Sequence, residues 1–95
     1  MIFKRKFPFK DNPNTLCFTC RHILNENKPI LYVSHDEDGV WQFLCGENHI
    51  SEDARIVSLS EIVCIEKNII ELSDLKYGEY AEFQIDEWVI HKKIP

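Results

Sequence analysis

The fold is decided by the stretch Ile30-Leu31-Tyr32-Val33-Ser34-His35-Asp36-Glu37-Asp38-Gly39-Val40-Trp41-Gln42-Phe43-Leu44-Cys45. Its two ends, residues 30–35 and 40–45, are rich in the β-branched and aromatic residues that favour strands. The polar segment between them ends in glycine, which adopts the positive φ that many hairpin loops need. The stretch therefore predicts a central β-hairpin. We expect a four-residue loop with His35 opposite Val40, a register that places Tyr32 opposite Phe43.

The sequence after the hairpin predicts one helical region over about residues 58–75 and two further strands. Ser58 and Glu61 have the spacing of a capping box, and apolar residues recur behind them with helical periodicity. Gly78 is a stop signal. Apolar and polar residues then alternate over residues 79–85, and residues 88–90 form a last apolar run. Strands that outnumber helices indicate an α+β fold built mainly on an antiparallel sheet.

The sequence before the hairpin is less distinct. Phenylalanines alternate with Lys4, Lys6 and Pro8, which predicts an N-terminal strand or extended arm within residues 1–14. Residues 15–24 fit either a strand or a helical turn. A length of 95 residues is typical of one domain, so we expect a single domain over residues 1–95.

Charge is distributed unevenly along the chain. Four of the 11 basic residues and none of the 16 acidic ones lie in the first ten positions, so the other 85 residues have a net charge of −9. An acidic body repels phosphate backbones, which argues against nucleic-acid binding and suits a basic protein partner or a metal cation. No apolar run approaches the ~20 residues of a membrane span. No apolar segment follows the basic N-terminus as in a signal peptide, so we expect a cytoplasmic protein with reduced thiols.

The strongest chemical signal is Cys17-x2-Cys20 followed, after twenty-four residues, by Cys45-x3-His49. Three thiolates and an imidazole are a ligand set of closed, tetrahedral zinc sites. The sequence therefore predicts that Cys17, Cys20, Cys45 and His49 bind zinc. The alternative is that the cysteines are small buried apolar residues. Cys17 and Cys20 also spell a redox motif, but no βαβ pattern surrounds them. Cys64 is expected to pack in the helical region, and His22 and His35 to be surface or hydrogen-bonded histidines.

A cluster of three carboxylates, Asp36, Glu37 and Asp38, lies at the expected hairpin tip. Aspartate is common in turns, so the cluster fits a solvated loop. It also fits a docking site for a basic protein partner, which would be attracted electrostatically. Both interpretations stay open at the level of the sequence.

Three segments resemble a bacterial family of unknown function that is linked to immunity proteins of polymorphic toxin systems. They are Ile30-Leu31-Tyr32-Val33-x3-Glu37-x3-Trp41-Gln42-Phe43-x2-Gly46, then Ile56-Val57-Ser58-Leu59-x2-Ile62, and finally Leu75-x2-Gly78-x2-Ala81-Glu82. The resemblance spans residues 17–83. It implies a small α+β domain that inhibits a toxin by tight binding.

Two classes of function follow. The first is a non-enzymatic binding protein, similar to an immunity protein, that acts on a protein partner such as a basic toxin. The second is a structural or interaction module stabilised by zinc. A thiol enzyme is a weaker third alternative.

Overall fold

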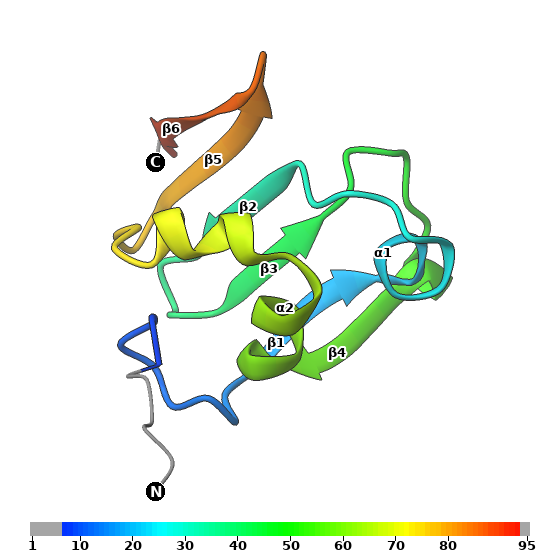
Figure 1. Ribbon diagram of the computed structural model, residues 1–95, viewed down its shortest axis with the longest axis horizontal. Helices are drawn as coiled ribbons and strands as arrows, with labels where there is room; N and C mark the ends of the chain where they lie inside the picture. The colour runs from blue at the N-terminus through cyan, green and yellow to red at the C-terminus, as the bar shows by residue number, and fades with distance from the viewer. Residues whose placement is uncertain (1–6, 94–95) are drawn as a thin grey trace, which may run out of the picture.

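The computed structural model describes residues 7–93, which form a six-stranded sheet with helices packed on it (Figure 1). The elements in chain order are β1 (Leu16–Cys20), α1 (Arg21–Glu26), β2 (Tyr32–His35), β3 (Trp41–Leu44), η1 (Ser51–Asp53), β4 (Ala54–Ser58), α2 (Leu59–Ile65), η2 (Lys67–Leu72), β5 (Glu79–Gln84) and β6 (Glu87–Lys92). The strand order is β4-β1-β3-β2-β5-β6, and every neighbouring pair except β1–β3 is antiparallel. The predicted α+β fold is confirmed.

The central hairpin is confirmed, but its predicted register is wrong by one residue. Tyr32 lies opposite Leu44, and Val33 lies opposite Phe43. The amide of Asp36 donates to the Val40 carbonyl at 2.8 Å, so the loop has three residues and ends at Gly39 with φ +90°. A three-residue loop closed by a residue in the left-handed region is a common hairpin connection.

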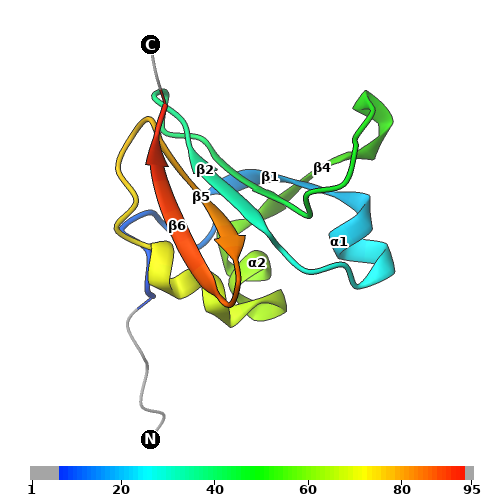
Figure 2. The ribbon, with the colours of Figure 1, turned by 90° about the horizontal axis from the view of Figure 1, so that it is seen from above.

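A shift of one residue changes which side chains share a face of the sheet. The buried residues Val33, His35, Trp41 and Phe43 now lie together on one face. This face packs against Leu59, Ile62, Ile69 and Leu72 of α2 and η2 to form the core. Figure 2 shows α2 and η2 on this side of the sheet and the η1 connection on the other. We call the side away from α2 the open face.

The helical prediction is confirmed in position and in its cap, but the expectation that Cys64 packs in this region is wrong, because Cys64 is exposed on α2. Ser58 accepts a hydrogen bond from the Glu61 amide, and the Glu61 carboxylate bonds back to the Ser58 amide. The predicted single helical region is incomplete, because α1 and η1 also form. Residues 15–24 contain both of the alternatives that the sequence allowed, a strand and then a helix. The last turn falls at Ile85 and Asp86, both with positive φ, so the strand predicted from the alternation over residues 79–85 ends one residue earlier, at Gln84.

The predicted N-terminal strand or arm lies partly outside the described residues, which begin at Phe7. Residues 7–14 form bends and a turn. Phe9 is buried and meets Trp41 edge-on, with ring centroids 4.9 Å apart. Over residues 7–93 no helix has both the length and the apolar character needed to cross a membrane.

Candidate metal centre

Four side chains with nitrogen or sulfur ligand atoms converge where β1 and β3 end. Cys20 is the last residue of β1, and Cys45 directly follows β3. The two strands are parallel neighbours, with Phe18 opposite Gln42, so their carboxyl ends meet at one edge of the sheet. His22 comes from the first turn of α1, and His49 comes from the loop after Cys45. The ligand atoms of Cys20, His22, Cys45 and His49 all lie within 4.8 Å of one another, so the cluster could hold a metal ion.

The distances around Cys45 fit tetrahedral coordination. Its sulfur lies 3.7 Å from Nδ1 of His22 and 3.5 Å from Nε2 of His49. In a tetrahedral site with ordinary zinc–sulfur and zinc–nitrogen bonds, the sulfur and nitrogen atoms are about 3.6 Å apart. Three of the four residues are buried, and His49 is exposed. The cluster is therefore arranged around a point that one ion can occupy, at the boundary between core and solvent.

The electrostatics of the cluster favour a cation. Burial raises the pKa of the Cys45 thiol, and the neighbouring Cys20 thiol raises it further. The Cys45 thiol therefore resists ionisation when no positive charge is near it. A divalent ion between the Cys20 and Cys45 sulfurs reverses this preference, because it stabilises both thiolates.

Cys17, the fourth ligand predicted from the sequence, lies outside this cluster. The predicted ligand set requires the sulfurs of Cys17 and Cys20 to face one point. The segment is β1, however, where residues three apart point to opposite faces. Cys17 is buried in the core. Burial raises its pKa to about 12, with a further contribution from Glu61. It is therefore a packing residue, the alternative that the sequence left open for all three cysteines.

His22 is a candidate ligand that the predicted set does not contain. Its signal was present, because Cys20-x-His22 and Cys45-x3-His49 are two short cysteine–histidine pairs. Each pair places a cysteine at the end of a strand and a histidine in the connection that follows. The repeated pattern becomes meaningful only when β1 and β3 are known to be parallel neighbours.

The loop that carries His49 is attached to α1 by charged contacts. Arg21 stands between Cys20 and His22 in the sequence. Its Nε donates to the buried Asp53 carboxylate at 2.6 Å. The other oxygen of Asp53 accepts the Ile50 amide at 3.0 Å. This backbone bond, together with Arg21, lowers the pKa of Asp53. Lys28 and Glu47 add an ion pair of 3.3 Å. The residues on both sides of His49 are therefore held close to α1.

The predicted acidic docking site is largely occupied by contacts within the chain. Asp36 accepts hydrogen bonds from Lys93 at 2.7 Å, from Gln42 at 2.8 Å and from Ser34 at 2.9 Å. Burial alone would raise the pKa of Asp36, but these three donors hold it below its usual value. Asp38 accepts the Val40 amide at 3.1 Å, and Glu37 is exposed. The turn interpretation accounts for Asp36 and Asp38, and docking at the tip stays a prediction.

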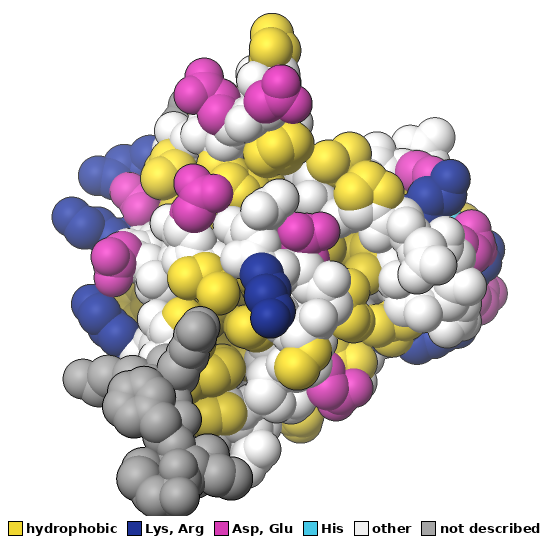
Figure 3. Space-filling model, in the orientation of Figure 1, with side chains coloured by type: hydrophobic (Ala, Val, Ile, Leu, Met, Phe, Trp, Pro, Cys, Tyr) yellow, Lys and Arg dark blue, Asp and Glu magenta, His cyan; other side chains and the backbone are white. Residues whose placement is uncertain are grey.

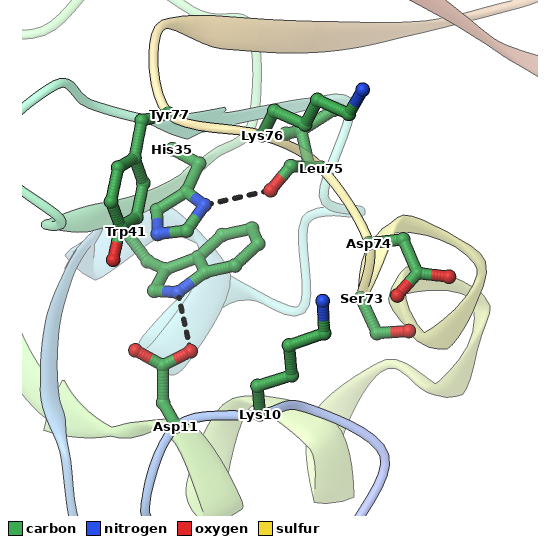
Figure 4. Close-up of a pocket in the computed structure, with 9 residues that line it drawn as sticks. All are labelled: Lys10, Asp11, His35, Trp41, Ser73, Asp74, Leu75, Lys76 and Tyr77. Atoms are coloured by element: carbon green, nitrogen blue, oxygen red, sulfur yellow. Dashed lines mark hydrogen bonds between the residues drawn. The ribbon is translucent and has the colours of Figure 1, made fainter.

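A hollow of about 300 Å³ lies near His35 and Trp41, at the end of the hairpin opposite to the metal centre (Figure 4). The Nδ1–H of His35 donates to the Leu75 carbonyl at 2.8 Å, and its ring stacks on Trp41 at 3.8 Å. Trp41 in turn donates to Asp11 at 3.3 Å. The sequence-based expectation that His35 is hydrogen-bonded is confirmed for one of its nitrogens, and Nε2 has no partner among residues 7–93.

Comparison with protein-family models, with curated proteins and with solved structures finds no match to this chain. The candidate metal centre therefore rests on its own geometry.

Proposed function

We propose that this protein is a small, non-enzymatic zinc-binding module in which Cys20, His22, Cys45 and His49 hold the ion. The observation that supports this is the convergence of four sulfur and nitrogen ligand atoms within 4.8 Å. Such atoms come from four separate positions in the chain, and a chance cluster of this kind would have no reason to match tetrahedral distances around Cys45.

The chemistry of the ligand set favours zinc over other common ions. Two thiolates and two neutral imidazoles are a recognised set for structural zinc, whereas calcium and magnesium take oxygen ligands. Thiolate and imidazole together also suit copper or iron, which a direct metal analysis distinguishes. The two thiolates neutralise the charge of the divalent ion, so the partly buried site carries no net charge.

A closed site argues for a structural role. Four protein ligands leave no position for water or substrate, which catalytic zinc requires. The ion would instead fasten the carboxyl ends of β1 and β3 to α1 and to the loop of residues 46–53. Small domains gain stability from such a link because their cores are small. Free thiols at this site require a reducing compartment, in keeping with the cytoplasmic location that the sequence predicts.

The test is a metal analysis of the purified chain, produced with ample zinc in the medium. We expect one equivalent of zinc in the wild-type protein. Cys20→Ser and His22→Ala should lose it, whereas Cys17→Ala and Cys64→Ser should keep it. Loss of metal in Cys17→Ala with retention in His22→Ala would support the ligand set predicted from sequence instead. A metal-free wild-type protein with four titratable thiols after unfolding would refute the proposal.

The resemblance to immunity proteins stays a prediction. A zinc-stabilised module that also inhibits a toxin would combine both classes, and neutralisation of a toxin encoded beside this chain would test it.

A further inference from the structure

We propose that the open face of the sheet carries a docking groove for an extended protein segment that combines apolar and basic side chains. The inference rests on the proposed zinc site, because the loop that carries His49 forms one wall of the groove.

The groove consists of two adjoining hollows. One, of about 430 Å³, lies over β2, β3 and β5, and the other, of about 210 Å³, lies over β1, β3 and the start of β4. Both are lined by Gln42, Leu44 and His49. The three shared residues join the two hollows into one depression that crosses β1, β3, β2 and β5. Neighbouring strands lie about 4.8 Å apart, so a depression across four strands can accept several side chains of an extended segment.

Large apolar side chains lie exposed along this depression. Phe18 is 40% exposed and Ile50 is 65% exposed, and both line the smaller hollow. Ile56 is 60% exposed and lies opposite Phe18 on the edge strand β4. Gathered apolar side chains on one face are typical of a surface that another molecule covers. Burial of these three side chains would supply the apolar part of the binding energy.

The charged side chains of the groove define the other half of the partner's chemistry. Among the residues described as lining the two hollows, the charged ones other than His49 are Glu47 and Glu82, and none is lysine or arginine. Glu82 contacts His91 at 3.4 Å. Glu47 contacts Lys28, which does not line the groove. The helix-covered face, by contrast, carries both acidic and basic side chains among apolar and polar ones (Figure 3). A basic residue in the partner would complement the groove, and the net charge of −5 would speed its approach.

The groove and the metal centre share a structural element. His49 is both a candidate ligand and a lining residue of both hollows. Ile50, the next residue, forms the wall beside Phe18. Metal binding fixes His49 and hence this wall, so the groove should be shaped only when the ion is bound. Docking and metal binding are therefore thermodynamically linked, and each should strengthen the other.

The experiment uses three synthetic peptides of equal length, titrated into the zinc-loaded full chain by calorimetry. One alternates leucine with lysine, one leucine with glutamate, and one serine with lysine. We expect the leucine–lysine peptide to bind at least about tenfold more tightly than the other two, because it alone matches both features of the groove. Chelation of zinc should weaken this binding by a similar factor.

Matched variants place the binding on the open face. Ile56→Ser should weaken binding of the leucine–lysine peptide, whereas Ile65→Ser on α2, which is 47% exposed, should not. Glu82→Lys should weaken it, whereas Glu71→Lys on η2 should not. Metal content and unfolding are measured on every sample, so that a misfolded variant is recognised.

Equal binding of all three peptides, equal effects of each pair of variants, or a dimer that excludes the peptide would overturn the inference. If the leucine–lysine peptide still binds after zinc is chelated from a zinc-loaded protein, the link between the groove and the metal is overturned. If the wild-type protein contains no metal and still binds this peptide, the proposed zinc site is refuted but the groove is not.

Discussion

The two sites predicted from the sequence differ in how they are assembled. The acidic tip, residues 36–38, consists of neighbours in the chain, and two of its three carboxylates accept hydrogen bonds from groups of the same chain. The metal centre draws Cys20 and Cys45 from two strands that are separated by a helix and a further strand. Its side chains find polar partners mainly in one another.

This difference separates a structural cluster from a ligand site. Carboxylates at a tight turn bond to nearby amides and amines, so their density in the sequence is explained without a partner. Two thiols and two imidazoles brought together through tertiary structure have no such local explanation. They are costly to bury unless they pair or bind an ion.

The largest expected effect is therefore metal removal. Chelation of the proposed zinc should lower the free energy of unfolding by several kcal/mol, because the ion binds the folded chain at a preformed site. Denaturant unfolding with and without a chelator measures this. The matched control is Cys20→Ser, whose stability should be low and unaffected by chelator. Equal stability of the wild-type protein in both conditions would contradict a structural ion.

A smaller effect is expected from changes to Arg21 and Asp53, which hold the loop that carries His49 in place. Arg21→Gln removes the contact that holds Asp53, and with it the anchoring of the loop that carries His49. Zinc affinity should fall by about 10–100-fold, as for other groups that orient metal ligands. Competition with a chromogenic chelator measures the affinity. Glu26→Gln removes the other, exposed partner of Arg21 and should change the affinity little.

The sequence was sufficient for elements whose cause is local. The hairpin follows from two β-rich runs around a glycine loop, and α2 begins where the Ser58–Glu61 capping box places it. The register was wrong because three- and four-residue loops fit the same residues, and only the Asp36–Val40 hydrogen bond distinguishes them. The parallel pairing of β1 with β3 has no local signal, since it depends on the crossover of the chain between them.

The metal centre, too, can be predicted from the sequence only in its local part, the spacing of residues that are close in the chain. Cys20, Cys45 and His49 were recognised from spacing alone. The spacing adds Cys17 because a two-residue gap can let both sulfurs face one point, but in the strand β1 the same gap puts the two sulfurs on opposite faces. Spacing does not single out His22, because its partner is Cys45, which lies 23 positions away in the chain.

Asp36 and the metal centre should also differ in the pH at which each is lost. Asp36 has a lowered pKa in the folded chain, so its contribution to stability is present above the ordinary aspartate value of about 3.9 and is lost as the pH falls through the lower folded value. During an acid titration the metal centre should release its zinc first, at a pH above the one at which Asp36 is protonated, because protons compete with zinc for the sulfur and nitrogen ligands. Asp36→Asn should cost about 1–2 kcal/mol at neutral pH and leave the pH of zinc release unchanged. Unfolding and metal content measured across an acid titration separate the two events, and simultaneous loss in the wild type would show that they are one.

The smallest expected effect lies at the exposed member of the tip. Glu37 makes no hydrogen bond or ion pair within the described residues, so Glu37→Lys should change stability by less than about 0.5 kcal/mol. If the groove is the docking surface, Glu37→Lys should also leave binding of the leucine–lysine peptide unchanged, whereas Glu82→Lys, with the same change in net charge, weakens it. The two variants are compared by calorimetry at low and at high salt, because long-range attraction is screened and a direct contact less so. A loss of affinity in Glu37→Lys that equals the loss in Glu82→Lys at both salt concentrations would return the docking site to the hairpin tip, where the sequence first placed it.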